Sequence, residues 1–180
     1  MRYHTEEEHI QSLQIIHDIA MSIRTNFDFD LMLKSALPTF LKKLNCSAGA
    51  IYQKETISDI ESNLIRIYSI PKNIDKIKEY EIVSNHINRK DPNTNFNEFY
   101  KKISENIHFY IFDLPNYGVM TLIKHGKEFS PLIISSLKPL LSKLADACND
   151  CITKKDKYNL EQRVKELDLL LELAEELSFE

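Results

Sequence analysis

Glycine is scarce in this chain, which has 180 residues and only three glycines. Gly49, Gly118 and Gly126 lie far apart, whereas a phosphate-binding loop needs several glycines close together so that its backbone can approach the phosphates. The sequence therefore excludes a glycine-rich nucleotide loop. Cysteine is scarce as well, and an odd number of three fits a reducing compartment better than a disulfide framework.

Long apolar runs are missing. No stretch reaches the roughly 20 apolar residues that a membrane-spanning helix needs, and the segment from Met1 to His9 lacks the apolar core of a signal peptide. A net charge of −4 gives no reason to expect a basic face for nucleic acid. We therefore expect a cytoplasmic protein that contacts neither a membrane nor nucleic acid.

Recognisable catalytic motifs are also absent: the sequence shows no paired carboxylates, no nucleophile beside a base and no cluster of metal ligands. Cys148 and Cys151 form a Cys-x-x-Cys pair, but zinc and iron–sulfur sites use four ligands, which this pair reaches only if two chains meet in a parallel dimer. We interpret both as small apolar residues of a helix interface. We predict no metal, no catalytic residue and no enzyme activity for this part of the protein, and the sequence identifies no cofactor.

The longest periodic stretch runs from Ser130 to Leu177. Ser130 and Pro131 are a typical helix start, because the hydroxyl caps the first turn and the missing N–H of proline costs nothing there. The pattern predicts one helix of roughly 70 Å with a kink at Pro139, too long for a domain of this size to bury. Apolar residues recur in it at spacings of three and four: Ile134, Leu137, Leu141, Leu144, Cys148 and Cys151, then, after a polar patch, Leu160, Val164, Leu167, Leu171 and Ala174.

The end of this helix resembles the beginning of the chain. Residues 167–177 match residues 13–23 in their apolar pattern, in an acidic residue at the sixth position and in an alanine at the eighth. Two explanations stay open: two amphipathic helices of similar composition, or the first helix of a following domain. We divide the chain into a domain of residues 5–152 and a helical linker of residues 153–180 that continues as a coiled coil.

The rest of the chain predicts an α+β fold, with a central antiparallel sheet flanked by helices. A capping box at Thr5 and Glu8 begins a first helix that ends near Thr25. Carboxylates at Asp28 and Asp30 begin a second helix, which ends near Asn45. We expect strands at 47–53, 63–70, 107–113 and 118–124, a helix at 74–87 (or a short strand at 81–83), a loop at 91–95, and a short amphipathic helix through Phe96, Phe99, Tyr100 and Ile103.

Three segments, in this order, resemble the GAF domain, a small-molecule sensor module of signalling proteins. The segments 27–33 and 44–52 are similar to the family's second helix and opening strand, and 112–122 is similar to the strand–turn–glycine–strand near its end. Phe129, with Leu137, Leu144, Ala145 and Ala147, resembles its closing helix. The resemblance implies a GAF-like sheet and a ligand pocket lined by residues 71–106.

Some GAF domains bind cyclic nucleotides through an Asn-Lys pair, a Phe and an Asp-Glu pair. Lys124 and Phe129 fit this motif, but the polar positions are replaced by Ile123, Ile133 and Ile134. We therefore expect that cyclic AMP and cyclic GMP do not bind.

Two sets of candidate site residues follow. Aromatic residues and histidines on elements expected to face the open side of the sheet are candidates for a ligand pocket, although the same residue types are ordinary in cores and at sheet edges: Tyr68, Tyr80, His86, His108, Tyr110 and Tyr117.

The terminal helices carry apolar stripes that are wider than one small sheet can cover. These stripes predict a homodimer through the terminal helices, with contacts from Leu13, Ile16, Ala20, Ile23, Leu137, Leu144, Cys148 and Cys151.

These features predict a non-catalytic sensory and dimerisation module of a larger signalling protein, of the sensor histidine kinase type, which relays a small-molecule or packing signal through its terminal helices. Two alternatives stay open. One is an enzyme on the same fold that modifies a small molecule, such as a methionine-sulfoxide reductase, which needs reactive cysteines in the pocket. The other is a structural spacer whose pocket is filled by its own side chains. The sequence identifies neither the ligand nor the output domain.

Overall fold

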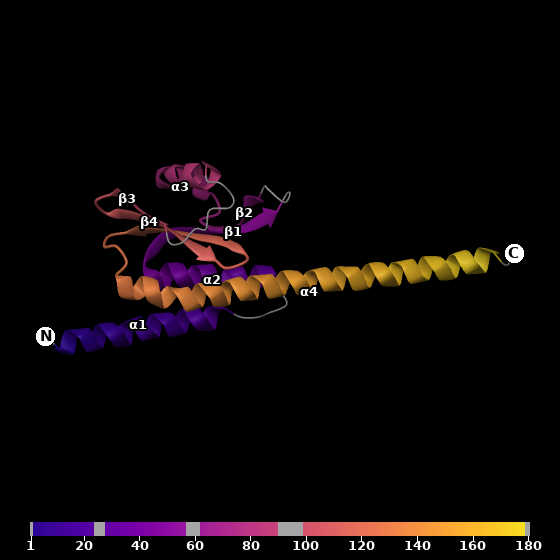
Figure 1. The fold of residues 1–180 in the computed structure, drawn as a ribbon, viewed down its shortest axis with the longest axis horizontal. Helices are drawn as coiled ribbons and strands as arrows, with labels where there is room; N and C mark the ends of the chain where they lie inside the picture. Colours follow the sequence, from indigo (N-terminus) through magenta and orange to yellow (C-terminus); the bar gives the residue numbers. More distant parts are fainter. Residues whose placement is uncertain (1, 24–27, 57–61, 90–98, 179–180) are drawn as a thin grey trace.

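The computed structural model describes residues 2–23, 28–56, 62–89 and 99–178. It confirms the predicted α+β fold: five strands form an antiparallel sheet in the order β2-β1-β5-β4-β3, with helices on both faces. Figure 1 shows α2 and α4 along one face, α1 beyond them and α3 over the opposite face. The elements are α1 (Arg2–Ser22), α2 (Phe29–Leu44), β1 (Cys46–Thr56), β2 (Ser62–Ile70), the 3-10 turn η1 (Ile74–Lys76), α3 (Lys78–Arg89), β3 (Phe99–Ser104), β4 (Ile107–Leu114), β5 (Gly118–His125) and α4 (Pro131–Ser178).

Most helix ends lie where the sequence predicts them. The Asp28 carboxylate accepts the N–H of Leu31 at 3.1 Å and caps the start of α2, and Asn45 ends α2 in the left-handed conformation that asparagine tolerates. At α4 the Ser130 hydroxyl accepts the N–H of Ile133 at 3.3 Å. The predicted start of the first helix is wrong: α1 already begins at Arg2, so Thr5 lies inside the helix and not at its N-cap position.

The predicted helix through Phe99, Tyr100 and Ile103 is also wrong, because this segment forms strand β3. Its spacing of three and four fits a helix, but the turn after it folds the segment back onto β4, where Tyr100 is opposite Tyr110. The hydrogen bonding of this segment to β4 therefore outweighs the helical spacing of its apolar residues. The helix predicted at 74–87 is confirmed as η1 and α3, which excludes a strand at 81–83. The loop at 91–95 and Phe96 lie outside the described residues.

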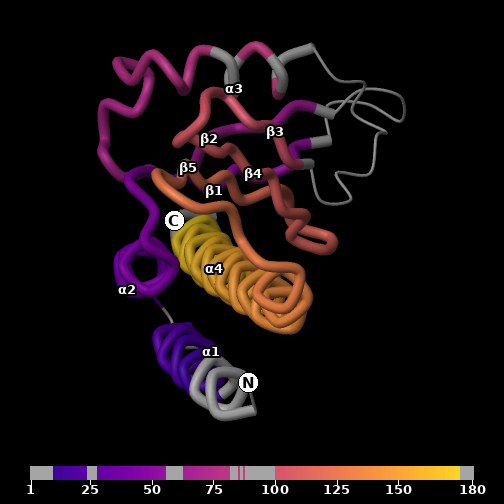
Figure 2. Tube along the Cα trace, turned by 90° about the vertical axis from the view of Figure 1, so that its left-hand side faces the viewer, coloured from indigo at the N-terminus to yellow at the C-terminus, as the bar shows by residue number. Residues whose placement is uncertain are grey.

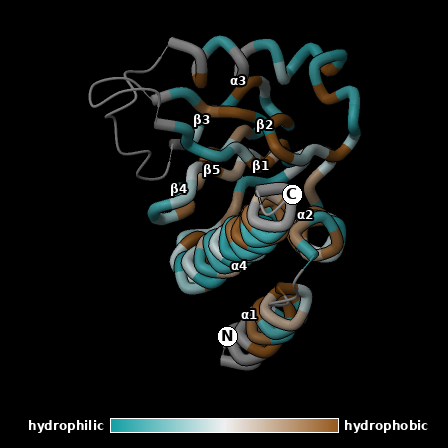
Figure 3. The backbone as a smooth tube through the Cα atoms, turned by 90° about the vertical axis from the view of Figure 1, so that its right-hand side faces the viewer, coloured by the Kyte–Doolittle hydropathy of each residue, from teal (hydrophilic) through white to brown (hydrophobic). Residues whose placement is uncertain are grey.

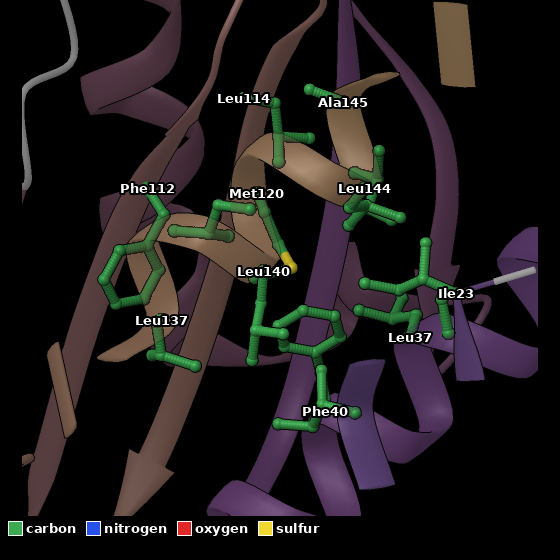
Figure 4. Close-up of a cluster of buried hydrophobic side chains, with 14 of the residues drawn as sticks. Ile23, Leu37, Phe40, Phe112, Leu114, Met120, Leu137, Leu140, Leu144 and Ala145 are labelled. Atoms are coloured by element: carbon green, nitrogen blue, oxygen red, sulfur yellow. The ribbon is translucent and has the colours of Figure 1, made fainter. Parts of the chain in front are cut away.

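Each face of the sheet carries its own hydrophobic core. The first, here called the three-helix core, lies between the sheet and α1, α2 and α4; Figure 4 shows strand residues Phe112, Leu114 and Met120 packed among Leu137, Leu140 and Leu144 of α4 and Leu37 and Phe40 of α2. The second, here called the α3 core, lies on the opposite face, where α3 and η1 cover the sheet (Figure 2). It contains Ala48, Ala50, Tyr52, Ile74, Tyr80, Ile87, Phe109, Ile111, Val119 and Ile123.

Gly118 is needed where β5 begins beside β1. A Cβ at this position would lie 2.0 Å from the backbone oxygen of Tyr52, so no larger residue fits without separating the two strands. The preceding turn reverses the chain at Asn116, which has a positive φ of 59°.

Helix α4 has two parts with different surroundings. Its first part, as far as Cys151, packs into the three-helix core. From Thr153 to Ala174 all side chains are exposed except the half-buried Gln162. The helix has 48 residues and is therefore about 72 Å long at 1.5 Å per residue, and its distal part extends away from the domain (Figure 1). The predicted long helix is thus confirmed.

Truncation of Leu144 tests whether α4 belongs to the core of a single chain. Leu144 is 0% exposed, so Leu144→Ala should lower the free energy of unfolding by about 2–5 kcal/mol through lost burial and a cavity. The matched control is Leu31→Ala on α2, where the side chain is 56% exposed and the loss should stay within about 0.5 kcal/mol. Urea denaturation followed by circular dichroism measures both, and equal losses would contradict the assignment.

Candidate functional site

The predicted pocket residues do not share one face of the sheet. Tyr68, Tyr110 and Tyr117 contact the three-helix core, whereas Tyr80 lies in the α3 core on the opposite side. The expectation that they line one open side is therefore wrong. Strand β4 is buried on both faces, so its apolar pattern could not indicate which alternate residues face the helices. The last candidate, His86, belongs to α3, and its side chain lies outside the described part of the structure.

His108 instead belongs to a polar network at the β3 edge of the sheet. The Tyr100 hydroxyl lies 2.9 Å from Nδ1 of His108 and 3.0 Å from Oε2 of Glu128. Nε2 of His108 lies 2.8 Å from the carbonyl oxygen of Gly126. The Tyr100 and His108 rings stack with centroids 5.9 Å apart. Tyr100 and Glu128 were not predicted as site residues, because their contact depends on pairing that brings β3 beside β4.

The protons carried by Tyr100 and His108 decide which hydrogen bonds of this network can form together. A carbonyl oxygen only accepts, so Nε2 of His108 donates to Gly126. The Tyr100 hydroxyl has one proton but two acceptors, Nδ1 of His108 and the Glu128 carboxylate. Partial burial and the bonded Glu128 raise the pKa of Tyr100, so the hydroxyl keeps that proton. Only when Nδ1 also carries a proton are all three hydrogen bonds made together.

Tyr110 connects β4 to the start of α4. Its hydroxyl accepts the N–H of Phe129 at 2.8 Å, and the two rings lie 4.5 Å apart. Lys124 supports the same junction: its ammonium donates to the carbonyl of Leu44 at 2.7 Å and lies 5.0 Å from the centre of the Phe129 ring. The lysine and phenylalanine that fit the cyclic-nucleotide motif are thus already bonded within the fold, at the C-terminal end of α2 where a positive charge is favourable.

The Tyr80 hydroxyl is the feature of the α3 core that most suggests a binding site. The side chain is 1% exposed, and no group among the described residues forms a hydrogen bond with the hydroxyl. A buried hydroxyl without a partner costs about 1–3 kcal/mol. A small molecule with a hydrogen-bonding group at this position would remove that cost.

The three cysteines lie where thiols react poorly. Cys148 and Cys151 are buried in or beside the three-helix core. Burial, reinforced by neighbouring Cys151, raises the pKa of Cys148 to about 12, and burial also raises the pKa of Cys46 to about 12. Burial raises the pKa of Cys151 too. The thiolate is the form that attacks and that binds metals, and the described residues contain no group of three or more potential metal ligands.

The predicted dimer contacts divide into two groups. Ile23, Leu137, Leu144, Cys148 and Cys151 are buried inside a single chain, so the prediction that they contact a second chain is wrong. The apolar stripe is real, but periodicity does not distinguish a neighbour in the same chain from one in another chain. The remaining residues stay at least partly accessible: Leu13 is 64% exposed, and Ile16 and Ala20 are half-buried.

An open groove lies along α1, beside the end of α2. Its floor and walls mix apolar and polar groups, and Lys43 of α2 forms an ion pair with Asp18 there, which lowers the pKa of Asp18. Figure 3 shows hydrophobic and hydrophilic residues alternating along α1 and α4. None of the predicted pocket residues lines this groove, which is formed by Ile10, Gln11, Leu13, Gln14, Ile15, His17, Asp18 and Lys43.

A comparison with protein-family models and with curated proteins found no match for this chain in either set. Within the described residues, no helix combines the length and the apolar character that crossing a membrane requires.

Thiol alkylation tests the surroundings of the cysteines. With a pKa of about 12, roughly one Cys46 or Cys148 thiol in ten thousand is ionised near pH 8. Iodoacetamide should therefore modify these cysteines in the folded protein at least about a hundredfold more slowly than in urea. Mass spectrometry of timed samples measures the rates. Rapid modification of Cys148 in the folded protein would contradict the buried position.

Removal of two buried hydroxyl groups tests the difference between Tyr80 and Tyr110. Tyr80→Phe removes a hydroxyl without a described partner and should leave stability unchanged or raise it by about 1 kcal/mol. Tyr110→Phe leaves the N–H of Phe129 without its acceptor and should lower stability by about 1–3 kcal/mol. Urea denaturation of the two variants gives the comparison, and a large loss in Tyr80→Phe would show that its hydroxyl is already satisfied.

Proposed function

We propose that residues 5–152 form a GAF-like sensory domain in the cytoplasmic input region of a larger signalling protein, of the sensor histidine kinase type. The observation that carries this proposal is the continuity of α4. One helix belongs to the core of the domain at its start and leaves the domain at its end. A change inside the domain therefore reaches whatever follows through a rigid element.

The packed part of α4 makes it sensitive to the state of the domain. Leu137, Leu140 and Leu144 lie among side chains of α2 and of the sheet. Lys143 also donates to the carbonyl of Ala20 in α1 at 2.7 Å. Because closely packed interiors transmit displacement rather than absorb it, a shift of the sheet or of α1 moves α4 as a body.

The signal in this proposal is a small molecule bound in the α3 core. The unsatisfied Tyr80 hydroxyl offers such a ligand one hydrogen bond that the described residues do not make. The sheet then connects both cores, since neighbouring residues of β4, such as Ile111 and Phe112, face opposite cores. A ligand that moves the α3 side of a strand therefore moves its α4 side as well.

Two observations bear on the alternatives. A reductase needs a reactive thiol, and burial raises the pKa of all three thiols, which favours a sensor over an enzyme. A structural spacer is favoured by the large side chains that fill both cores, among them Phe40, Phe109 and Phe112. A spacer binds no ligand, so native mass spectrometry of the freshly purified protein separates it from a sensor.

Residue insertions in α4 test the proposed relay. Residues 1–180 are fused through α4 to the catalytic half of a dimeric histidine kinase, and autophosphorylation is measured. One alanine inserted after Lys155 rotates everything beyond it by about 100° and should lock or abolish the output. Seven inserted residues restore the helical face and should largely preserve it. Unchanged output with both insertions would mean that α4 is only a tether.

A further inference from the structure

Two side chains of the β3–β4 hairpin hold the segment that leads from β5 into α4. Nε2 of His108 donates to the carbonyl of Gly126 at 2.8 Å, and the Tyr100 hydroxyl lies 3.0 Å from the carboxylate of Glu128. Residues 126–128 are exposed and belong to no helix or strand. These two bonds therefore help to fix the segment against the edge of the sheet.

The two bonds compete when the His108 imidazole is neutral. Nε2 then carries the only proton of the ring, and the Tyr100 hydroxyl can donate either to Nδ1 or to the Glu128 carboxylate. The contact left without a proton brings two lone pairs to 2.9 or 3.0 Å, where they repel each other. A protonated imidazole removes the conflict, because Nδ1 donates to Tyr100 and Tyr100 donates to Glu128.

Charged groups face His108 from both neighbouring strands. The imidazole is 5% exposed, so burial opposes its charge, as do Lys102 of β3 and Lys124 of β5, which are opposite it in the sheet. Lys102 is exposed, so salt and water screen it, and the Lys124 ammonium is already bonded to the last carbonyl of α2 at 2.7 Å. The Glu128 carboxylate reaches the imidazole through Tyr100, and hydrogen bonds between charged groups are the strong ones.

Three further titratable groups on this side of the sheet stay neutral. Burial raises the pKa of Tyr110, two residues from His108 in β4, and raises the pKa of Cys46 in β1 to about 12. Partial burial and Glu128 raise the pKa of Tyr100. Histidine is the residue type that changes its charge between about pH 5 and 8.

We propose that His108 is a pH switch for the segment that precedes α4: its protonated form fastens residues 126–128 to the sheet edge, and its neutral form releases Glu128. Glu128 is the partner released because the stacked rings, 5.9 Å apart, keep Tyr100 beside His108. The switch is closed at acidic pH and opens as the pH rises. It depends on the hydrogen-bond network alone, whereas any effect on the output rests on the relay through α4 proposed above.

Amide exchange at the start of α4 tests the switch. The probe is the N–H of Phe129, which follows Glu128 and donates to the Tyr110 hydroxyl. After correction for the intrinsic pH dependence of exchange, protection of this amide in the whole chain should fall at least about tenfold between about pH 5.5 and about pH 8, as one hydrogen bond to a charged group is lost. Protection that changes by less than about twofold would overturn the proposal.

Two variants separate the switch from other effects of pH, and both alter exposed side chains. In Glu128→Gln the amide donates to the Tyr100 hydroxyl, which then donates to a neutral His108, so all three bonds form in both protonation states. Protection of Phe129 should stay high in this variant and change by less than about twofold. In Tyr100→Phe it should be low at both ends of the pH range.

The matched control is Glu105→Gln, which removes an exposed carboxylate from the β3–β4 turn and should keep the pH dependence of the natural chain. A Glu128→Gln variant that follows pH as the natural chain does would overturn the proposal. The insertion experiment is run at a single pH, so it decides the relay independently of this result.

Discussion

The packing of the first part of α4 is the constraint on which the rest of the structure depends. The sheet needs a cover on the face that carries Phe112, Leu114 and Met120, and α4 and α2 provide it together. α1 in turn contacts α2 and α4 on the side away from the sheet (Figure 1). Without the packed part of α4, the three-helix core would lose the buried side chains of Leu137, Leu140 and Leu144, and α1 would keep α2 as its neighbouring helix.

The junction before α4 fixes where that packing begins. The Tyr110 hydroxyl holds the N–H of Phe129, and Lys124 connects the same phenylalanine to the end of α2. The Ser130 hydroxyl then caps the helix one residue later. Beside this junction, the Tyr100 hydroxyl links His108 of β4 to Glu128. The junction is therefore held from β3, β4, β5 and α2 together, which sets the direction in which α4 leaves the domain.

Much of the fold could be predicted from local chemistry. The Asp28 cap, the end of α2 at Asn45 and the start of α4 at Ser130 each depend on one or two neighbouring residues, and the structure confirms them. The spacing of the β3 residues predicts a helix, because the pairing of this segment with β4 is not encoded in that spacing. The prediction that the pocket residues share one face is wrong for a related reason. Alternation along β4 divides its residues between two faces, but because both faces are buried it does not show which face meets the helices α2 and α4. Similarly, the stripe of Leu137 and Leu144 indicates burial, not which chain provides the neighbour.

Native-state hydrogen exchange measures most directly whether α4 belongs to the domain and also leaves it. Amides of α4 from Leu137 to Cys151 should exchange only by global unfolding, with the same free energy as amides in the centre of β5. Amides beyond Lys157 should exchange by local opening, faster by orders of magnitude in dilute protein. Faster exchange in the packed part of α4 than in β5 would show that α4 opens without disturbing the sheet and so is not part of its core.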